Sequence, residues 1–148
     1  MVFDYELDFK TINFREQPEL YRVGRGEQGV LLVEPYKSEI LPYWRFKTPE
    51  IAKESSDKIF EMYVSYKEKN DFIGMDMSRK FLQMGYTRSR RYANHKSGKK
   101  YDANGEVMAR EVDSEKMKSA AIFKDKWKVV REDQDYLKLK KIHQKNYG

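Results

Sequence analysis

The sequence predicts an α+β fold in which a small antiparallel N-terminal sheet packs against about four helices. All four prolines lie between positions 18 and 49 of the 148 residues. Because proline interrupts helices and central strands, this boundary marks a change of architecture. Apolar residues alternate with polar ones before the boundary and recur at helical spacing after it. No linker or internal repeat divides the chain, so residues 1–148 are predicted to form a single domain.

The predicted sheet begins where Tyr5, Leu7 and Phe9 alternate with charged residues, which is typical of a half-buried strand. Two β-prone runs follow at 20–23 and 30–33, around a glycine-rich connection. We interpret these two runs as a hairpin. A further extended piece is expected through residues 43–46.

The remainder of the chain is predicted to be helical at about 50–69, 72–84, 114–130 and from 133 onwards. Thr48 is suited to cap the first of these helices, and either Asp113 or Ser114 the third. Gly85 is a natural C-terminal stop for the second helix. A short helix at 87–95 would then loosely imitate a helix-turn-helix.

Composition narrows the chemistry available to the protein. The chain has no Cys and two His, which excludes disulfides, thiolate catalysis and Cys-based metal sites. We therefore predict no cofactor and no metal. No apolar stretch is long enough for a membrane span, and the N-terminus is acidic where a signal peptide would be basic. A cytoplasmic protein that does not bind membranes is the expectation, and the oligomeric state stays open.

The positive charge is concentrated in one part of the chain. Residues 77–101 carry eight Lys and Arg with no Asp or Glu, whereas the whole chain has a net charge of +6. A local excess of one sign steers a polyanion toward a defined face. The sequence therefore points to the 79–100 basic segment as a binding surface.

Within this segment, basic side chains are interleaved with Tyr and Asn, a combination that suits phosphate contacts and base stacking. Our leading hypothesis is a non-enzymatic protein that binds nucleic acid or another phosphate ligand. The predicted contacts are Arg88, Arg90, Arg91, Tyr92, His95, Lys96, Lys99 and Lys100, with Tyr101 as another stacking candidate. Two other interpretations stay open: a solvated basic surface, and a face that docks an acidic protein partner.

A second anion site is suggested by the pattern Gly24-Arg25-Gly26-Glu27-Gln28-Gly29, a literal G-x-G-x-x-G. Such glycines let a backbone approach phosphate oxygens closely. The dinucleotide version needs a following helix, whereas a strand-like run follows here. The glycines can equally serve turn geometry alone. Arg22 and Arg25 are the candidate anion contacts, and whether this loop shares a face with the basic segment is left open.

The third hypothesis is a small enzyme that acts on a phosphate-bearing substrate, for example a metal-dependent nuclease. Its candidate residues are Glu27, Glu34 and His95, with Glu39 near Glu34 in the sequence. Two-metal hydrolysis needs carboxylates that converge on cations, and the spacing here does not match the usual arrangement. We therefore assign no catalytic residue.

Three segments of the chain carry a resemblance to a known family: residues 21–47, 71–100 and 119–126. They resemble the domain of unknown function 4385, a family of bacteria and bacteriophages. The resemblance implies a stand-alone small domain in a bacterial or phage-infected cell. It implies no activity, cofactor or catalytic residue.

Overall fold

The computed structural model describes residues 3–94, 103–105 and 113–148, and within them every regular element is a helix. The predicted α+β class is therefore wrong: the described chain is all-α, without strands. Two short 3-10 turns, η1 (Pro18–Leu20) and η2 (Leu41–Tyr43), accompany five α-helices. These helices are α1 (Tyr36–Ile40), α2 (Pro49–Glu68), α3 (Phe72–Asn94), α4 (Ser114–Glu132) and α5 (Gln134–Tyr147).

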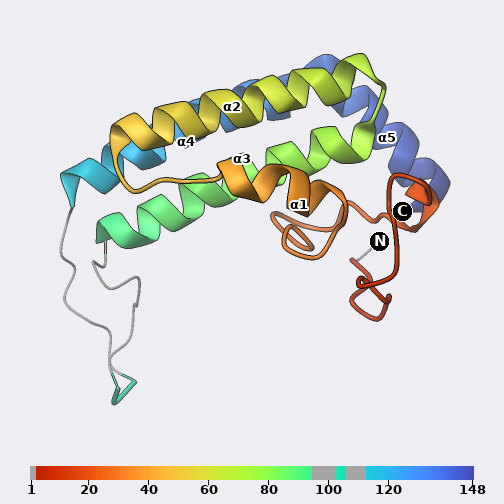
Figure 1. Cartoon of the computed structure of the whole chain (residues 1–148), viewed down its shortest axis with the longest axis horizontal. Helices are drawn as coiled ribbons and strands as arrows, with labels where there is room; N and C mark the ends of the chain where they lie inside the picture. Colours follow the sequence, from red (N-terminus) through yellow and green to blue (C-terminus); the bar gives the residue numbers. More distant parts are fainter. Residues whose placement is uncertain (1–2, 95–102, 106–112) are drawn as a thin grey trace.

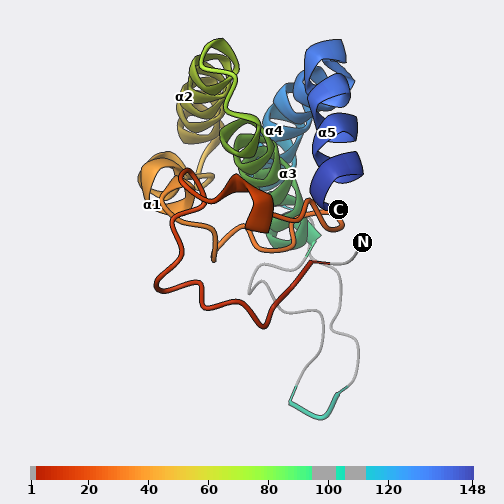
Figure 2. The same cartoon turned by 90° about the vertical axis from the view of Figure 1, so that its right-hand side faces the viewer.

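The long helix α3 forms the centre of the molecule. It packs most extensively against α4 and then against α2, and it also contacts α5 and α1. Figure 1 shows α2 and α3 running side by side along the long axis, and Figure 2 shows α2, α4 and α5 on one side of α3 with the N-terminal segment on the other. Residues 72–82 of α3 are buried without exception. None of the described helices combines the length and apolarity needed to cross a bilayer.

The first third of the chain forms turns and extended loops rather than the predicted hairpin. Tyr21, Val23, Val30 and Val33 are buried, so the β-prone residues of the two runs belong to the core without forming strands. Their neighbourhood satisfies its backbone groups locally, for example through the Val30 amide, which donates to the Glu27 carbonyl at 3.1 Å. Residues with high β-propensity can be buried from turns and extended loops, and their burial does not require a partner strand.

The predicted starts of α2, α4 and α5 are confirmed. Sequence could reveal them because each is set by a local capping residue. Thr48 accepts a hydrogen bond from the Ile51 amide at 3.2 Å and begins α2. Asp113 accepts from the amides of Glu115 and Lys116 and begins α4. Asp133 accepts from the Asp135 amide at 3.0 Å and caps the start of α5, directly after α4 ends at Glu132.

Gly85 does not end a helix, contrary to our expectation. It lies inside α3, which continues to Asn94, so the separate 87–95 helix and the imitation of a helix-turn-helix are wrong. A Cβ atom at Gly85 would come within 3.0 Å of the Phe123 ring of α4. The glycine is needed for the close approach of two helices, a requirement that a pattern within one helix cannot reveal.

Candidate nucleic-acid interface

A buried ion network lies at the start of the predicted basic segment. The Asp76 carboxylate accepts hydrogen bonds from the Arg79 guanidinium at 2.7 Å and from the Tyr136 hydroxyl at 2.6 Å, and the Tyr21 hydroxyl also donates to it. The Lys80 ammonium lies 3.8 Å from the same carboxylate. Arg79 and Lys80 are 7% and 0% exposed. These two cations are therefore part of the core and are not available to a ligand.

Burial and mutual attraction shift the pKa values within this network. Burial by itself would raise the pKa of Asp76, but the charges of Arg79 and Lys80 more than offset it, and the pKa lies well below its usual range. Burial lowers the pKa of Lys80 to about 8, against the attraction of Asp76. Burial also raises the pKa of Tyr21 and of Tyr136, and the charge of Asp76 adds to both shifts.

The glycine loop is attached to α3 by these same cations. Arg79 donates to the Gly26 carbonyl at 2.6 Å, and Lys80 donates to the Gln28 carbonyl at 2.6 Å. Glu27 accepts from the Thr87 hydroxyl at 2.7 Å. Carbonyl oxygens that face cations are the opposite of the N–H groups that hold a phosphate. The contacts along α3 also show that the loop lies beside this helix up to Thr87, directly before the exposed arginines.

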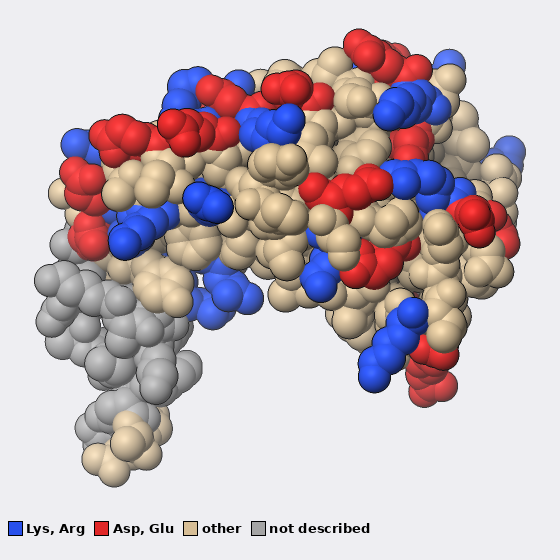
Figure 3. Space-filling view, in the orientation of Figure 1, with Lys and Arg blue, Asp and Glu red and all other residues tan. Residues whose placement is uncertain are grey.

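The last turns of α3 present three arginines in different surroundings from those of Arg79. Arg90 and Arg91 are exposed and Arg88 is half-buried. None of the three forms an ion pair within residues 3–94, 103–105 and 113–148. The Arg90 guanidinium instead donates a hydrogen bond to the Tyr86 hydroxyl at 3.1 Å. Figure 3 shows this end of the molecule on the left, where Lys and Arg side chains border an uncharged surface below an upper edge that carries charges of both signs.

Helix α4 extends the basic surface with a second set of aromatic and cationic groups. The Tyr86 and Trp127 rings are stacked with centroids 5.7 Å apart. The Lys124 ammonium lies 5.7 Å from the Tyr86 centroid, and the Arg131 guanidinium lies 4.3 Å from that of Trp127. Stacked aromatics flanked by cations can hold further π-systems and anions.

The other predicted contact residues do not all gather at this surface. Arg22 donates to the Glu19 carbonyl at 2.7 Å, and its neighbour Tyr21 reaches Asp76. Asp76 precedes Arg88 by twelve residues, about 18 Å of helix. Arg22 therefore lies near the opposite end of α3, whereas Arg25 is exposed on the glycine loop and Tyr92 lies on α3. His95, Lys96, Lys99, Lys100 and Tyr101 lie outside the described residues.

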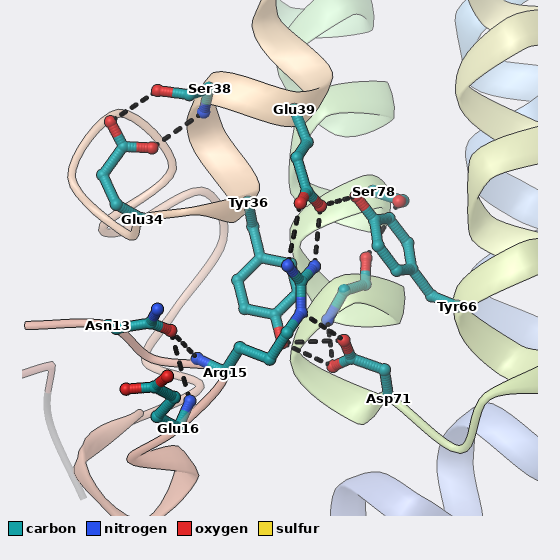
Figure 4. A network of polar contacts seen from close by, with 11 residues as sticks. Asn13, Arg15, Glu16, Glu34, Tyr36, Ser38, Glu39, Tyr66, Asp71 and Ser78 are labelled. Atoms are coloured by element: carbon teal, nitrogen blue, oxygen red, sulfur yellow. Dashed lines mark hydrogen bonds and ion pairs between the residues drawn. The ribbon is translucent and has the colours of Figure 1, made fainter.

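A second polar network clamps the N-terminal segment to the helices (Figure 4). Arg15 forms a two-pronged contact with Glu39 of α1 at 2.7 and 2.8 Å, and its Nε lies 3.6 Å from Asp71 before α3. Tyr66 donates to Glu39 and Tyr36 donates to Asp71, each at 2.7 Å. The hydrogen bond from Arg15 holds the pKa of Glu39 below its usual range. Because every charged group here has a partner, we interpret the network as structural.

The carboxylates considered for an enzyme face separate protein partners. Glu34 accepts from the backbone amide and the hydroxyl of Ser38 at 2.8 and 2.7 Å, whereas Glu39 faces Arg15 (Figure 4). Glu27 faces Thr87. In the part of the chain that the structure describes, no three His, Asp or Glu residues are grouped so that they could hold a metal ion.

Sequence reasoning missed the roles of Asp76 and Tyr136. A signal was present, because Asp76 stands between Met75 and Met77 with basic residues three and four positions later. That spacing places an acid and its cations on one helix face. A carboxylate in an otherwise apolar run is buried only when it is paired, so this pattern predicts an internal ion pair.

Comparison with known proteins adds the family of the chain. No curated protein and no solved structure matches it. The family described as "Domain of unknown function (DUF4385)" matches residues 4–146, nearly the whole chain. The chain belongs to this family.

Proposed function

We propose that this protein binds nucleic acid through the basic surface at the C-terminal end of α3. The observation that supports the proposal is the contrast within that helix: Arg79 and Lys80 are paired in the core, whereas Arg88, Arg90 and Arg91 reach the surface without ion pairs among the described residues. Arginines that reach the surface without a carboxylate partner supply charge-assisted hydrogen bonds to phosphates.

The neighbouring residues of α4 and of the linker before α2 favour a polyanion over a single small anion. Lys124 and Arg131 lie on the Tyr86–Trp127 stack to one side of the arginines. Arg45, Lys47 and Lys116 lie together around Phe46 and Tyr92. A chain of phosphates can neutralise cations distributed over such a surface, and it releases counterions as it binds. A nucleic-acid ligand would place the protein in the cytoplasm.

The decisive experiment measures binding of labelled DNA and RNA by fluorescence anisotropy over a salt series. The test variant replaces Arg88, Arg90 and Arg91 together with Gln. We expect the log–log salt slope to fall in magnitude by about 2 to 3, since each phosphate contact contributes about 0.7 to 0.9. The matched control replaces Lys138, Lys141 and Lys145 of α5, which are also exposed and carry the same total charge.

Two outcomes would contradict the proposal. Equal losses in the test and control variants would mean that bulk charge, and not this surface, attracts the ligand. Absence of binding by the wild type even at low salt would leave the arginines without a nucleic-acid role and would favour an acidic protein partner.

A further inference from the structure

A pocket of about 460 Å³ lies next to the exposed arginines of α3. Four elements build it: the linker before α2, the first turn of α2, the end of α3 and the start of α4. Its lining residues are Arg45, Phe46, Lys47, Ile51, Tyr92 and Lys116. The volume falls within the range of small-ligand sites, which are about 300 to 1,000 Å³.

The apolar part of the pocket is an aromatic pair held by its neighbours. The Phe46 and Tyr92 centroids are 5.9 Å apart, at 37° between the ring planes. Behind them, Trp44 packs on Phe46 at 5.0 Å and donates its indole N–H to the Phe81 carbonyl of α3 at 3.0 Å. The linker that carries Phe46 is therefore anchored to α3, which lowers the entropic cost of ordering this side of the pocket when a ligand binds.

The charged side chains that line the pocket within residues 3–94, 103–105 and 113–148 are all cationic: Arg45, Lys47 and Lys116. The Lys116 ammonium donates to the Lys47 carbonyl at 2.6 Å and lies 5.8 Å from the Phe46 centroid. A ligand that matches both parts must present a flat π-system and a negative charge. A nucleotide has these two features within one unit.

We propose that this pocket receives an unpaired nucleobase of single-stranded nucleic acid while the flanking phosphates contact the arginines of α3. The inference rests on the proposed nucleic-acid function and specifies its ligand. In a duplex, each base is stacked and paired, so no base face is free for Phe46 and Tyr92. Single strands offer such faces, and aromatic side chains bind them with little dependence on sequence.

The first test needs no substitution. Wild-type protein is titrated with a labelled single strand, with a strand of equal length and charge that lacks bases, and with the duplex. We expect the intact strand to bind roughly five- to 100-fold more tightly than the abasic strand, the range that one stacked base supplies. Equal affinity for intact and abasic strands would overturn the inference, while a steep salt dependence would still support the basic surface.

The second test locates the base in this pocket. Phe46→Leu and Tyr92→Leu should each reduce the preference for the intact over the abasic strand and leave the salt slope unchanged. Tyr43→Leu is the matched control, because Tyr43 is an exposed aromatic at the end of η2, directly before this linker, and lies outside the pocket. An unchanged preference in both pocket variants would overturn the inference. So would a free mononucleotide that competes as strongly as the strand. Equal losses of binding in the arginine variant and in its α5 control would instead disprove the proposed function itself.

Discussion

The two ends of α3 carry the same residue types in opposite surroundings. Near its start, Arg79 and Lys80 are buried and share Asp76 with two tyrosine hydroxyls. Near its end, Arg88, Arg90 and Arg91 have no carboxylate partner among the described residues. The first group is covered by the glycine loop and α5, whereas the second follows Thr87, which donates a hydrogen bond to Glu27 of this loop. Coverage by other segments, and not residue type, therefore separates structural cations from those available to a ligand.

The largest effect is expected at Asp76. Asp76→Asn keeps the shape of the side chain but leaves Arg79 and Lys80 buried without a counter-charge. We expect the free energy of unfolding to fall by about 3 to 5 kcal/mol, measured by urea unfolding. The same substitution at Asp57, which pairs with Lys53 and Lys126 on the surface, should cost less than about 1 kcal/mol. Similar losses in the free energy of unfolding at Asp76 and Asp57 would show that buried and exposed carboxylates contribute equally to stability, contrary to this comparison.

An intermediate effect is expected from the titration of Lys80. Its pKa is about 8 in the folded protein and 10.5 ordinarily, so between these values the unfolded chain holds a proton that the folded chain has lost. The free energy of unfolding should therefore rise from pH 8 to pH 10, on the order of 1 to 3 kcal/mol. Above pH 10 the raised pKa values of Tyr21 and Tyr136 act in the opposite direction, because unfolding releases their protons.

Urea unfolding at several pH values measures this dependence. In Lys80→Met the rise between pH 8 and pH 10 should disappear, because the titrating group is absent. A wild-type stability that stays level or falls across that interval would show that Lys80 retains its ordinary pKa in the folded protein.

The smallest effect on stability is expected at the exposed arginines. Replacing Arg88, Arg90 and Arg91 with Gln should change the free energy of unfolding by less than about 0.5 kcal/mol at each site. The reason is that no ion pair is broken among the described residues, while mutual repulsion is relieved. Thermal and urea unfolding, compared with the wild type, measure the change. A loss as large as that of Asp76→Asn would place these arginines in a structural network and weaken their assignment to ligand binding.

The sequence predicted the helical part of the fold well and the N-terminal part poorly. Helix starts depend on one side chain and the next few amides, so Thr48 and Asp113 could be recognised without knowledge of the fold. The runs at 20–23 and 30–33 were misinterpreted because β-prone residues around glycines resemble a hairpin, whereas here the Gly26 and Gln28 carbonyls accept hydrogen bonds from side chains of α3. The arginines of the candidate surface were predicted, whereas the contributions of Phe46 and Lys116 were not, since they adjoin Tyr92 only after folding.

By itself, the sequence determined the features that depend on near neighbours: the capped helices after Thr48, the absence of cysteine chemistry and the concentration of basic residues between 77 and 101. Tertiary structure decided which of those basic residues are buried, that Gly85 is a point of helix contact and that the glycine loop serves α3. The physical reason is the range of the forces. Capping and helical periodicity act over a few residues, whereas desolvation depends on which distant segments cover a side chain.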